Sequence, residues 1–227
     1  MSKNIALIPA RAGSKGLQDK NIKLLEGVPL IDYTINAALA SDFFDEIILS
    51  SDGDNILERA DATGVIGLRR PSEYSTDDSS SDSVIEYVIK TRGYDDLDTI
   101  TLLQPTSPLR TSTHIQEARS RFLKKKPKML CSVKEIDKEL LKSFTLLSDG
   151  FMLPISSPDY AYTARQKLPC VVKPNGAIYM FLVSTFMENS QLPREGTLSY
   201  MMDDFSSLDI NDQVDIDKAE MILKRRR

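Results

Sequence analysis

Short apolar segments alternate with amphipathic helical segments up to residue 133, and this alternation constrains the fold more than any other feature. Units of strand, helix and strand joined in this way build a mostly parallel sheet with helices on both faces. We therefore expect an α/β fold in three layers, with ligands bound beyond the carboxyl ends of the strands. The predicted strands are residues 5–8, 46–50, 65–68, 99–103 and 129–133, and helical periodicity is found at 29–39, 54–62, 84–89 and 115–122.

The alternation stops after Val133, where residues 135–174 are polar and interrupted by prolines. We interpret this stretch as an excursion from the sheet that forms a lid or a subunit contact. Order resumes with a predicted strand at 176–181, a second near 206–210 and a final helix. With 227 residues and 41% hydrophobic side chains, the chain is expected to form a single domain, 1–227, with a substantial core.

The composition excludes several classes of protein. Lys and Arg total 29 against 33 Asp and Glu, and a net charge of −4 argues against a general nucleic-acid surface. Cys131 and Cys170 have no Cys-x-x-Cys spacing, so we expect free thiols in a reducing cytoplasm. His114 is the only histidine, and its position at the start of a predicted helix favours a surface cap. The apolar run at 5–8 is too short for a signal peptide or a membrane span.

A basic, glycine-containing loop follows the first predicted strand. Arg11, Lys15 and Lys20 lie there with Gly13 and Gly16. Backbone donors and cations at the carboxyl end of a strand form a natural anion site, and Arg and Lys are the cations that hold phosphate oxygens. The loop has neither a Walker motif nor Gly-x-Gly-x-x-Gly, and the same residues occur in ordinary turns.

Further polar loops follow later strands. Residues 68–72 could be an ordinary polar loop, and residues 79–83 an ordinary helix cap. The loop 104–110 is more distinctive, because two prolines stiffen it. In the acidic segment 207–215, Asn211 or Asp212 suits a helix N-cap. Asp209 is expected at the end of a strand, where a carboxylate can hold Mg²⁺.

Together these motifs resemble the acylneuraminate cytidylyltransferases, which activate nine-carbon 2-keto sugar acids. The resemblance covers nearly the whole chain, and the order and spacing of its motifs make a chance match improbable. It implies a Rossmann-like nucleotidyltransferase fold. The matching segments are Ala10–Gly16 with Lys20 and Asn21, Leu103–Arg110, Pro174–Tyr179 and Leu208–Asn211.

The resemblance implies transfer of CMP from CTP to the anomeric hydroxyl of the sugar acid, with release of pyrophosphate and with Mg²⁺ or Mn²⁺ as cofactor. It assigns catalytic roles to Arg11, Lys20 and Asp209, and metal binding to Asp209 with Asn211 as a doubtful second ligand. The nucleotide-binding residues are then Arg11, Ser14, Lys15, Lys20, Asn21, Arg70 and Ser81, and the sugar-binding residues are Gln104, Lys142, Arg165 and Tyr179.

The family resemblance also implies a cytoplasmic homodimer in which the excursion caps the sugar site of the neighbouring subunit, with no nucleic-acid or membrane partner. Two alternatives stay open. The same reaction on legionaminic or pseudaminic acid is one of them, because no residue settles the sugar. The other is a catalytically inactive, CTP-binding regulatory protein, since Asn211 stands where the family commonly has a second Asp.

Overall fold

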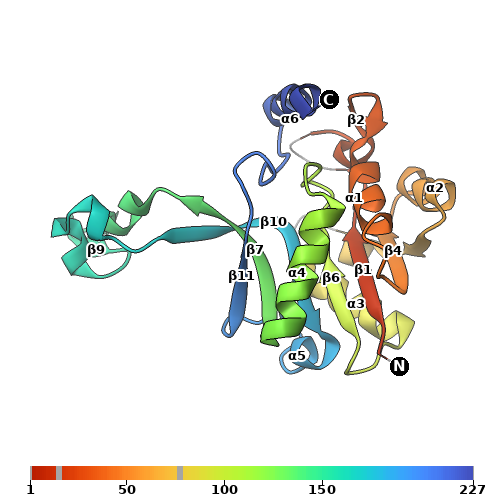
Figure 1. The fold of residues 1–227 in the computed structure, drawn as a ribbon, viewed down its shortest axis with the longest axis horizontal. Helices are drawn as coiled ribbons and strands as arrows, with labels where there is room; N and C mark the ends of the chain where they lie inside the picture. The colour runs from red at the N-terminus through yellow and green to blue at the C-terminus, as the bar shows by residue number, and fades with distance from the viewer. Residues whose placement is uncertain (1, 14–16, 76–78, 227) are drawn as a thin grey trace.

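A seven-stranded sheet forms the centre of the computed structural model, which describes residues 2–13, 17–75 and 79–226 (Figure 1). The strand order is β11-β7-β10-β6-β1-β4-β5. Strand β10 runs antiparallel to its neighbours β6 and β7, and the other neighbouring pairs are parallel. The predicted α/β class with a mostly parallel sheet is confirmed. The strands are β1 (Asn4–Pro9), β4 (Glu46–Ser51), β5 (Ile66–Arg69), β6 (Thr99–Leu102), β7 (Met129–Ile136), β10 (Val171–Leu182) and β11 (Thr197–Met201).

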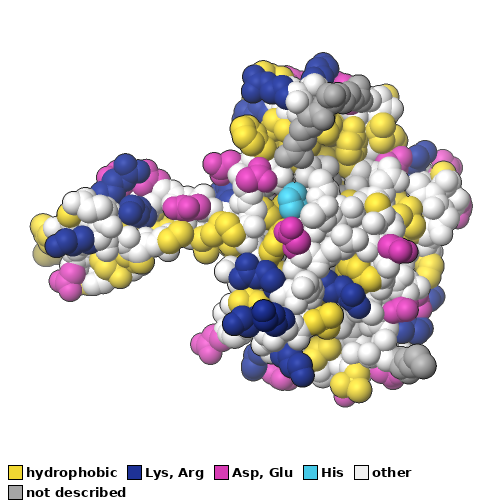
Figure 2. Space-filling view, viewed as in Figure 1, with side chains coloured by type: hydrophobic (Ala, Val, Ile, Leu, Met, Phe, Trp, Pro, Cys, Tyr) yellow, Lys and Arg dark blue, Asp and Glu magenta, His cyan; other side chains and the backbone are white. Residues whose placement is uncertain are grey.

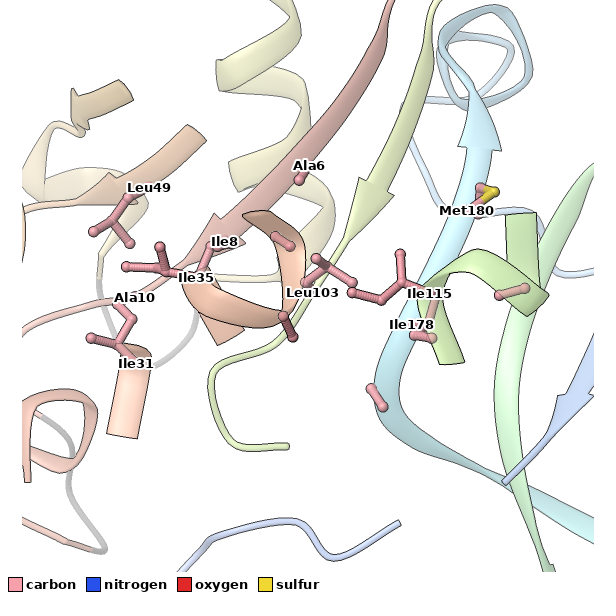
Figure 3. Packing of buried hydrophobic residues seen from close by; sticks show 14 of the residues in the cluster. Ala6, Ile8, Ala10, Ile31, Ile35, Leu49, Leu103, Ile115, Ile178 and Met180 are labelled. Carbon is pink, nitrogen blue, oxygen red and sulfur yellow. The ribbon is translucent and has the colours of Figure 1, made fainter. Parts of the chain in front are cut away.

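Helices cover both faces of the sheet, which gives the three layers expected from the sequence. One face packs against α1 (Leu30–Leu39), α2 (Asp54–Thr63) and α4 (Ser112–Lys125). Figure 3 shows side chains from α1 and α4 meeting those of the strands in this layer. The opposite face packs against α3 (Ser81–Arg92) and α5 (Val183–Met187). Burial of the apolar stripe of each helix is the main stabilising contribution to this arrangement.

The C-terminal helix α6 (Gln213–Arg226) forms a third apolar cluster with α1 and with the hairpin β2 (Leu24–Leu25) and β3 (Val28–Pro29). Ile216 and Ala219 are buried there, as predicted. Asp212 caps the helix by accepting a hydrogen bond from the Asp215 backbone N–H at 3.0 Å.

Two predictions of local structure were wrong, and one strand was not predicted. Residues 206–210 form a turn and a loop rather than a strand, and the strand in this region is the unpredicted β11. Leu39, expected on the inner face of its helix, is 44% exposed. Ile210 is nevertheless fully buried in the α6 cluster, so its apolar character reflects packing of a loop.

An arm projects from one side of the molecule (Figure 1). Strands β7 and β10 continue past the sheet as a two-stranded ribbon that pairs Val171 with Ile136. Between them lie the hairpin β8 (Phe144–Leu146) and β9 (Met152–Pro154) and three short 3₁₀ helices. Figure 2 shows hydrophobic side chains exposed along this arm. Phe151 and Tyr162, which belong to the arm, are 72% and 92% exposed. The helices are η3 (Lys138–Lys142), η4 (Pro158–Tyr162) and η5 (Arg165–Lys167).

Candidate active site

The loop after β1 is tied to the end of β4, which places it at the carboxyl edge of the sheet. The Ala10 backbone N–H donates to Ser50 O at 2.9 Å, and the Ala12 N–H donates to Asp52 Oδ1 at 2.9 Å. Asn21, buried in the short helix η1 (Lys20–Ile22), donates from Nδ2 to Arg11 O at 2.9 Å. The loop and η1 are thus held as one unit. Ser14 and Lys15, which were predicted to bind nucleotide, lie outside the described residues.

Lys20 connects this unit to the acidic segment near the C-terminus. Its Nζ donates to Ile210 O at 3.0 Å. Partial burial lowers the pKa of Lys20, the neighbouring Asp209 carboxylate opposes this shift, and the Arg11 guanidinium adds to it. Cations from the loop and a carboxylate therefore meet within one electrostatic environment, as the motifs predicted.

Asp209 has a carboxylate oxygen of the kind that a divalent cation takes as a ligand. Its Oδ1 is buried and has no hydrogen-bond partner among the described residues, while Oδ2 accepts from Asn211 Nδ2 at 3.1 Å. A buried carboxylate oxygen without a partner is costly unless a cation or water satisfies it. Mg²⁺ and Mn²⁺ take such oxygen ligands, so the residues present fit the expected metal, with Asp209 as the charged ligand. This oxygen lies in a loop, not at the end of a strand.

Arg70 adds a further cation at the same edge. It is 4% exposed, and its Nε donates to Ser75 Oγ at 2.9 Å. Burial lowers the pKa of Arg70, Asp52 opposes this effect and Arg11 reinforces it. Arg70 is therefore close enough to the loop after β1 to feel its charges.

A cavity of about 490 Å³ brings together Ser81, Gln104 and Tyr179, and Tyr179 lies close enough to Asp209 for that charge to act on the phenol. Ser81 is the first residue of α3, and Gln104 follows β6. Burial, reinforced by the nearby Cys131 and Asp209, raises the pKa of Tyr179 to about 12, so the phenol stays protonated at neutral pH. The remaining lining residues are Leu102, Met129, Cys131, Val133, Val172, Pro174, Leu192, Pro193, Arg194, Thr197 and Ser199.

No role was predicted for Gly176 and Arg110, yet both contact Gln104, which lines this cavity. Gly176 has φ +81°, and a Cβ there would lie 2.6 Å from Gln104 Oε1, so only glycine fits. The Arg110 guanidinium is buried, and Nη1 donates to Gln104 O at 3.2 Å and to Ala177 O at 2.8 Å. Burial lowers the pKa of Arg110 to about 9. The sequence did hold a signal for both residues, because Arg110 ends the motif Leu103–Arg110 and Gly176 lies within Pro174–Tyr179.

Lys142 and Arg165 are not brought to this site within one chain. Both lie on the arm, in η3 and η5. Arg165 is 60% exposed and forms ion pairs with Asp137 at 3.4 Å and with Glu139 at 3.7 Å. The predicted sugar-binding residues therefore divide into two groups. Gln104 and Tyr179 line the cavity, whereas Lys142 and Arg165 lie on the arm.

His114 has the capping role that the sequence predicted. It is the third residue of α4, and its Nδ1 accepts from the Thr111 backbone N–H at 3.1 Å. Thr111 Oγ1 accepts in return from the His114 N–H at 3.4 Å, which completes a capping box. Among the described residues, no helix is long and apolar enough to cross a membrane.

Comparison with known proteins places this site in a family. The family model described as Cytidylyltransferase matches residues 5–167. The N-acylneuraminate cytidylyltransferase of Escherichia coli O18:K1:H7 is 36% identical over 99% of this chain but 53% of its own length, so the chain spans about half of that relative. The CMP-N,N'-diacetyllegionaminic acid synthase of Legionella pneumophila is 33% identical over 97% of this chain and 96% of its own length.

A solved structure shares the fold. The CMP:2-keto-3-deoxy-manno-octonic acid synthetase complexed with CTP superposes with a TM-score of 0.74 over 100% of both chains, at 17% identity. This likeness confirms the nucleotidyltransferase fold that the sequence motifs implied. The sequence match, the superposition and the cation-lined loop agree, and the chain belongs to the cytidylyltransferase family.

Proposed function

We propose that this protein transfers CMP from CTP to the anomeric hydroxyl of a nine-carbon 2-keto sugar acid of the acylneuraminate type. The observation that carries the proposal is the meeting of Lys20 with the Asp209 loop beside a cavity lined by Gln104 and Tyr179. In this proposal the cations would hold the triphosphate, Asp209 would supply an oxygen ligand for a metal, and the cavity would receive the sugar. The E. coli relative named for acylneuraminate adds sequence support.

The loop after β1 holds the triphosphate in this proposal. Arg11 and Lys20 neutralise phosphate oxygens while the sugar oxygen attacks the α-phosphorus in line. A bond forms between that oxygen and phosphorus while the hydroxyl proton passes to water. The bond from phosphorus to the bridging oxygen breaks, and pyrophosphate leaves. Lys20 is held by Ile210 O, so its charge is fixed where negative charge develops. Asn21, Arg70 and Ser81 would contact the cytidine, and Ser14 and Lys15 would add phosphate contacts.

Asp209 would hold the divalent cation, which when bound withdraws charge from the phosphate oxygens. Its Oδ1 is buried and has no hydrogen-bond partner within the part of the chain that the structure describes. Asn211 donates to Oδ2 and so fixes the orientation of the carboxylate, although as an amide it adds no charge. We propose Mg²⁺ as the physiological metal, with Mn²⁺ as a substitute.

The sugar site would be completed by a second subunit. Lys142 and Arg165 carry cations suited to the sugar carboxylate, but they lie on the arm away from the cavity of their own chain. The arm exposes Phe151 and Tyr162, apolar surface of the kind that a subunit contact buries. We therefore propose a homodimer in which residues 135–174 reach the cavity of the partner. The free thiols Cys131 and Cys170 are consistent with the cytoplasmic location that we propose.

Legionaminic acid is the alternative substrate. The Legionella relative named for its diacetyl form matches this chain over nearly the full length of both. Its identity of 33% is close to the 36% of the E. coli relative, so sequence similarity separates the two sugars only weakly. Pseudaminic acid is a more distant possibility, because the Campylobacter jejuni enzyme named for it is 28% identical.

Pyrophosphate release tests the proposal. The protein would be incubated with CTP and Mg²⁺ and, separately, with N-acetylneuraminate, legionaminate, pseudaminate and the eight-carbon acid KDO. We expect turnover with a nine-carbon acid and much less with KDO. Turnover confined to KDO would contradict the sugar assignment. CTP binding without turnover on any acid would instead favour the regulatory protein.

A further inference from the structure

Strand β10 contains a large bulge inside the motif Pro174–Tyr179, of which the proposed function uses only Tyr179. Between the pairs made by Pro174 and Tyr179 with β7, residues 175–178 stand opposite Ser132 alone. Such an insertion removes backbone N–H and C=O groups from the ladder, and these buried groups need other partners. The side chains that satisfy them are Asn175, Ser132 and Arg110.

Asn175 is the centre of this network. Its amide is 6% exposed, and Oδ1 accepts from Ser132 Oγ at 2.6 Å and from the Ala177 N–H at 3.2 Å. Its Nδ2 donates to Ser207 Oγ at 2.9 Å and to Met202 Sδ at 3.4 Å. The amide thus uses two acceptor and two donor positions, which fixes its orientation. A buried network satisfied to this degree is rigid.

On one side the network sets the sugar cavity. Ser132 Oγ accepts from the Ile178 N–H at 2.7 Å, so the bulge leads into Tyr179 in a fixed conformation. The Ala177 carbonyl accepts from Arg110, which also donates to Gln104 O. The backbone of the bulge and that of Gln104 are therefore held by the same guanidinium.

On the other side the network reaches the metal ligand. Ser207 lies two positions before Asp209 in the loop that precedes α6. After Asp209, the Ile210 N–H donates to Thr106 O at 2.8 Å, and Ile210 O accepts from Lys20. Asp209 is thus held between an anchor at Ser207, supplied by Asn175, and an anchor at Ile210.

The bulge also forms the wall between two hollows. Pro174 lines the 490 Å³ cavity and also a neighbouring pocket of about 410 Å³. Asn175, Ser207 and Asp209 line the second pocket. A shift of the bulge would therefore change the metal side and the sugar side together.

We propose that Asn175 is a positioning residue, which sets Asp209 relative to Gln104 and Tyr179 through its hydrogen bond to Ser207. The proposal rests on the proposed function for its kinetic consequences, but its structural part does not. In this proposal Asn175 acts through other side chains and does not itself contact a substrate. Misplacement of a reacting group by about 1 Å costs on the order of a hundredfold in rate, so the loss of one anchor should be measurable.

Ser207→Ala gives the sharpest test, because it removes the acceptor for Asn175 Nδ2 without substituting Asp209 itself. Without metal or substrate, amide hydrogen exchange at residues 208–210 should accelerate by about tenfold. The Mn²⁺ concentration for half-saturation with CTP present, followed by electron paramagnetic resonance, should rise roughly tenfold. With the sugar acid, kcat should fall about tenfold while its KM changes by less than about twofold. Ser207→Thr keeps the hydroxyl and should restore all three.

Ser41→Ala is the matched control. Ser41 is 3% exposed and donates to Ala38 O at 2.7 Å, at the far end of α1 from the site. Ser41→Ala removes a buried serine hydroxyl, as Ser207→Ala does. We expect it to leave amide hydrogen exchange at 208–210 and Mn²⁺ binding unchanged. If Ser207→Ala does not fold, Ser207→Cys keeps the packing and weakens the hydrogen bond, with the same expected changes.

Asn175→Asp extends the test to both sides of the bulge, because it replaces two donors by a charged acceptor. We expect a larger fall in kcat than for Ser207→Ala, together with a raised KM for the sugar acid. Wild-type exchange and Mn²⁺ binding in Ser207→Ala, or equal changes in Ser41→Ala, would overturn the proposal. A wild-type protein inactive on every sugar acid would contradict the proposed function instead. The hydrogen-exchange and Mn²⁺-binding measurements would still decide the role of Asn175.

Discussion

Lys20 is the single side chain whose removal should affect the reaction most. Its ammonium donates to Ile210 O and feels the charge of the Asp209 carboxylate, and the side chain belongs to no core cluster. We expect Lys20→Ala to lower kcat by about a hundredfold or more with CTP and Mg²⁺ saturating, as for deletion of a transition-state donor. The exposed Lys90, in an ion pair on α3, is the control, and Lys90→Ala should keep wild-type turnover. Equal turnover in both variants would remove Lys20 from the mechanism.

The pair Asp209 and Asn211 makes a prediction about metal dependence. Of the two, Asp209 alone brings a charge, and its Oδ1 has no hydrogen-bond partner among residues 2–13, 17–75 and 79–226. Asp209→Asn should be nearly inactive at every Mg²⁺ concentration. Asn211→Asp should stay active and need less Mg²⁺ for the half-maximal rate, because a second carboxylate adds attraction for the cation. Titration of rate against Mg²⁺ checks both, and a higher requirement in Asn211→Asp would contradict this view of the site.

At the residue scale, chemistry was easier to predict from sequence than packing. Arg11, Lys20 and Asp209 stood out because charged side chains in loops after strands have few structural uses. Asn175 and Arg110 did not stand out as site-shaping residues. Their roles depend on which backbone groups a bulge leaves without partners, and that depends on strand register, which one sequence does not reveal.

Among the elements, the arm makes a prediction that separates the two substrates. Arg165 lies in η5 and is assigned to a carboxylate that only the sugar carries. Arg165→Ala should raise the KM for the sugar acid by about tenfold or more and that for CTP by less than about twofold. Lys167→Ala, in the same short helix, is the control and should change neither. Equal effects of Arg165→Ala on both substrates would show that the assignment is wrong.

Strand β4 begins at Glu46, which makes a prediction about pH. It accepts hydrogen bonds from Lys3 Nζ at 2.8 Å, Arg92 Nη2 at 2.9 Å and Tyr94 OH at 2.7 Å. Burial alone would raise the pKa of Glu46, but these bonds outweigh it and hold the pKa at about 2. Because this pKa lies below the ordinary value of 4.5, the stabilisation is complete above pH 4.5 and is lost as the pH falls towards 2.

We therefore expect Glu46→Gln to lower the free energy of unfolding at pH 7 by roughly 1–2 kcal/mol, discounted for the exposed Lys3 partner. The difference from the wild type should shrink steadily below pH 4.5. Urea unfolding at several pH values measures it. Glu58→Gln, on the exposed side of α2, should be close to neutral throughout. A difference that grows on acidification would contradict the direction of the pKa shift.

Most elements could be predicted because their apolar periodicity reports burial directly. The failures came where that link breaks. Residues 206–210 alternate in polarity as a strand does, yet Ile210 is buried by α6 from within a loop. Strand β11 is a short edge strand of mixed exposure, so its sequence has little apolar pattern. The antiparallel direction of β10 follows from the long connection through the arm and not from any residue in the strand.

At the scale of the whole molecule, the proposed dimer rests on the predicted sugar-binding cations, Lys142 and Arg165, which do not line the cavity of their own chain. We expect a dimer by light scattering at micromolar concentration. Substituting Phe151 and Tyr162 by Asp, at exposed positions of the arm, should give a folded monomer, because apolar contact area would be replaced by repelling carboxylates. Turnover should fall as the dimer is lost. A fully active monomer would contradict the shared site.

The place of β10 between β6 and β7 has a consequence for how the chain folds during synthesis. The order of strands puts a late segment in the middle of the sheet, and β7 joins the earlier strands only through it. Until β10 has left the ribosome, β6 presents an unpaired edge and β7 has no neighbour on that side. Such edges are templates for aggregation. Chains that stop within the arm should therefore depend on chaperones, whereas chains that extend past Leu182 can close the sheet.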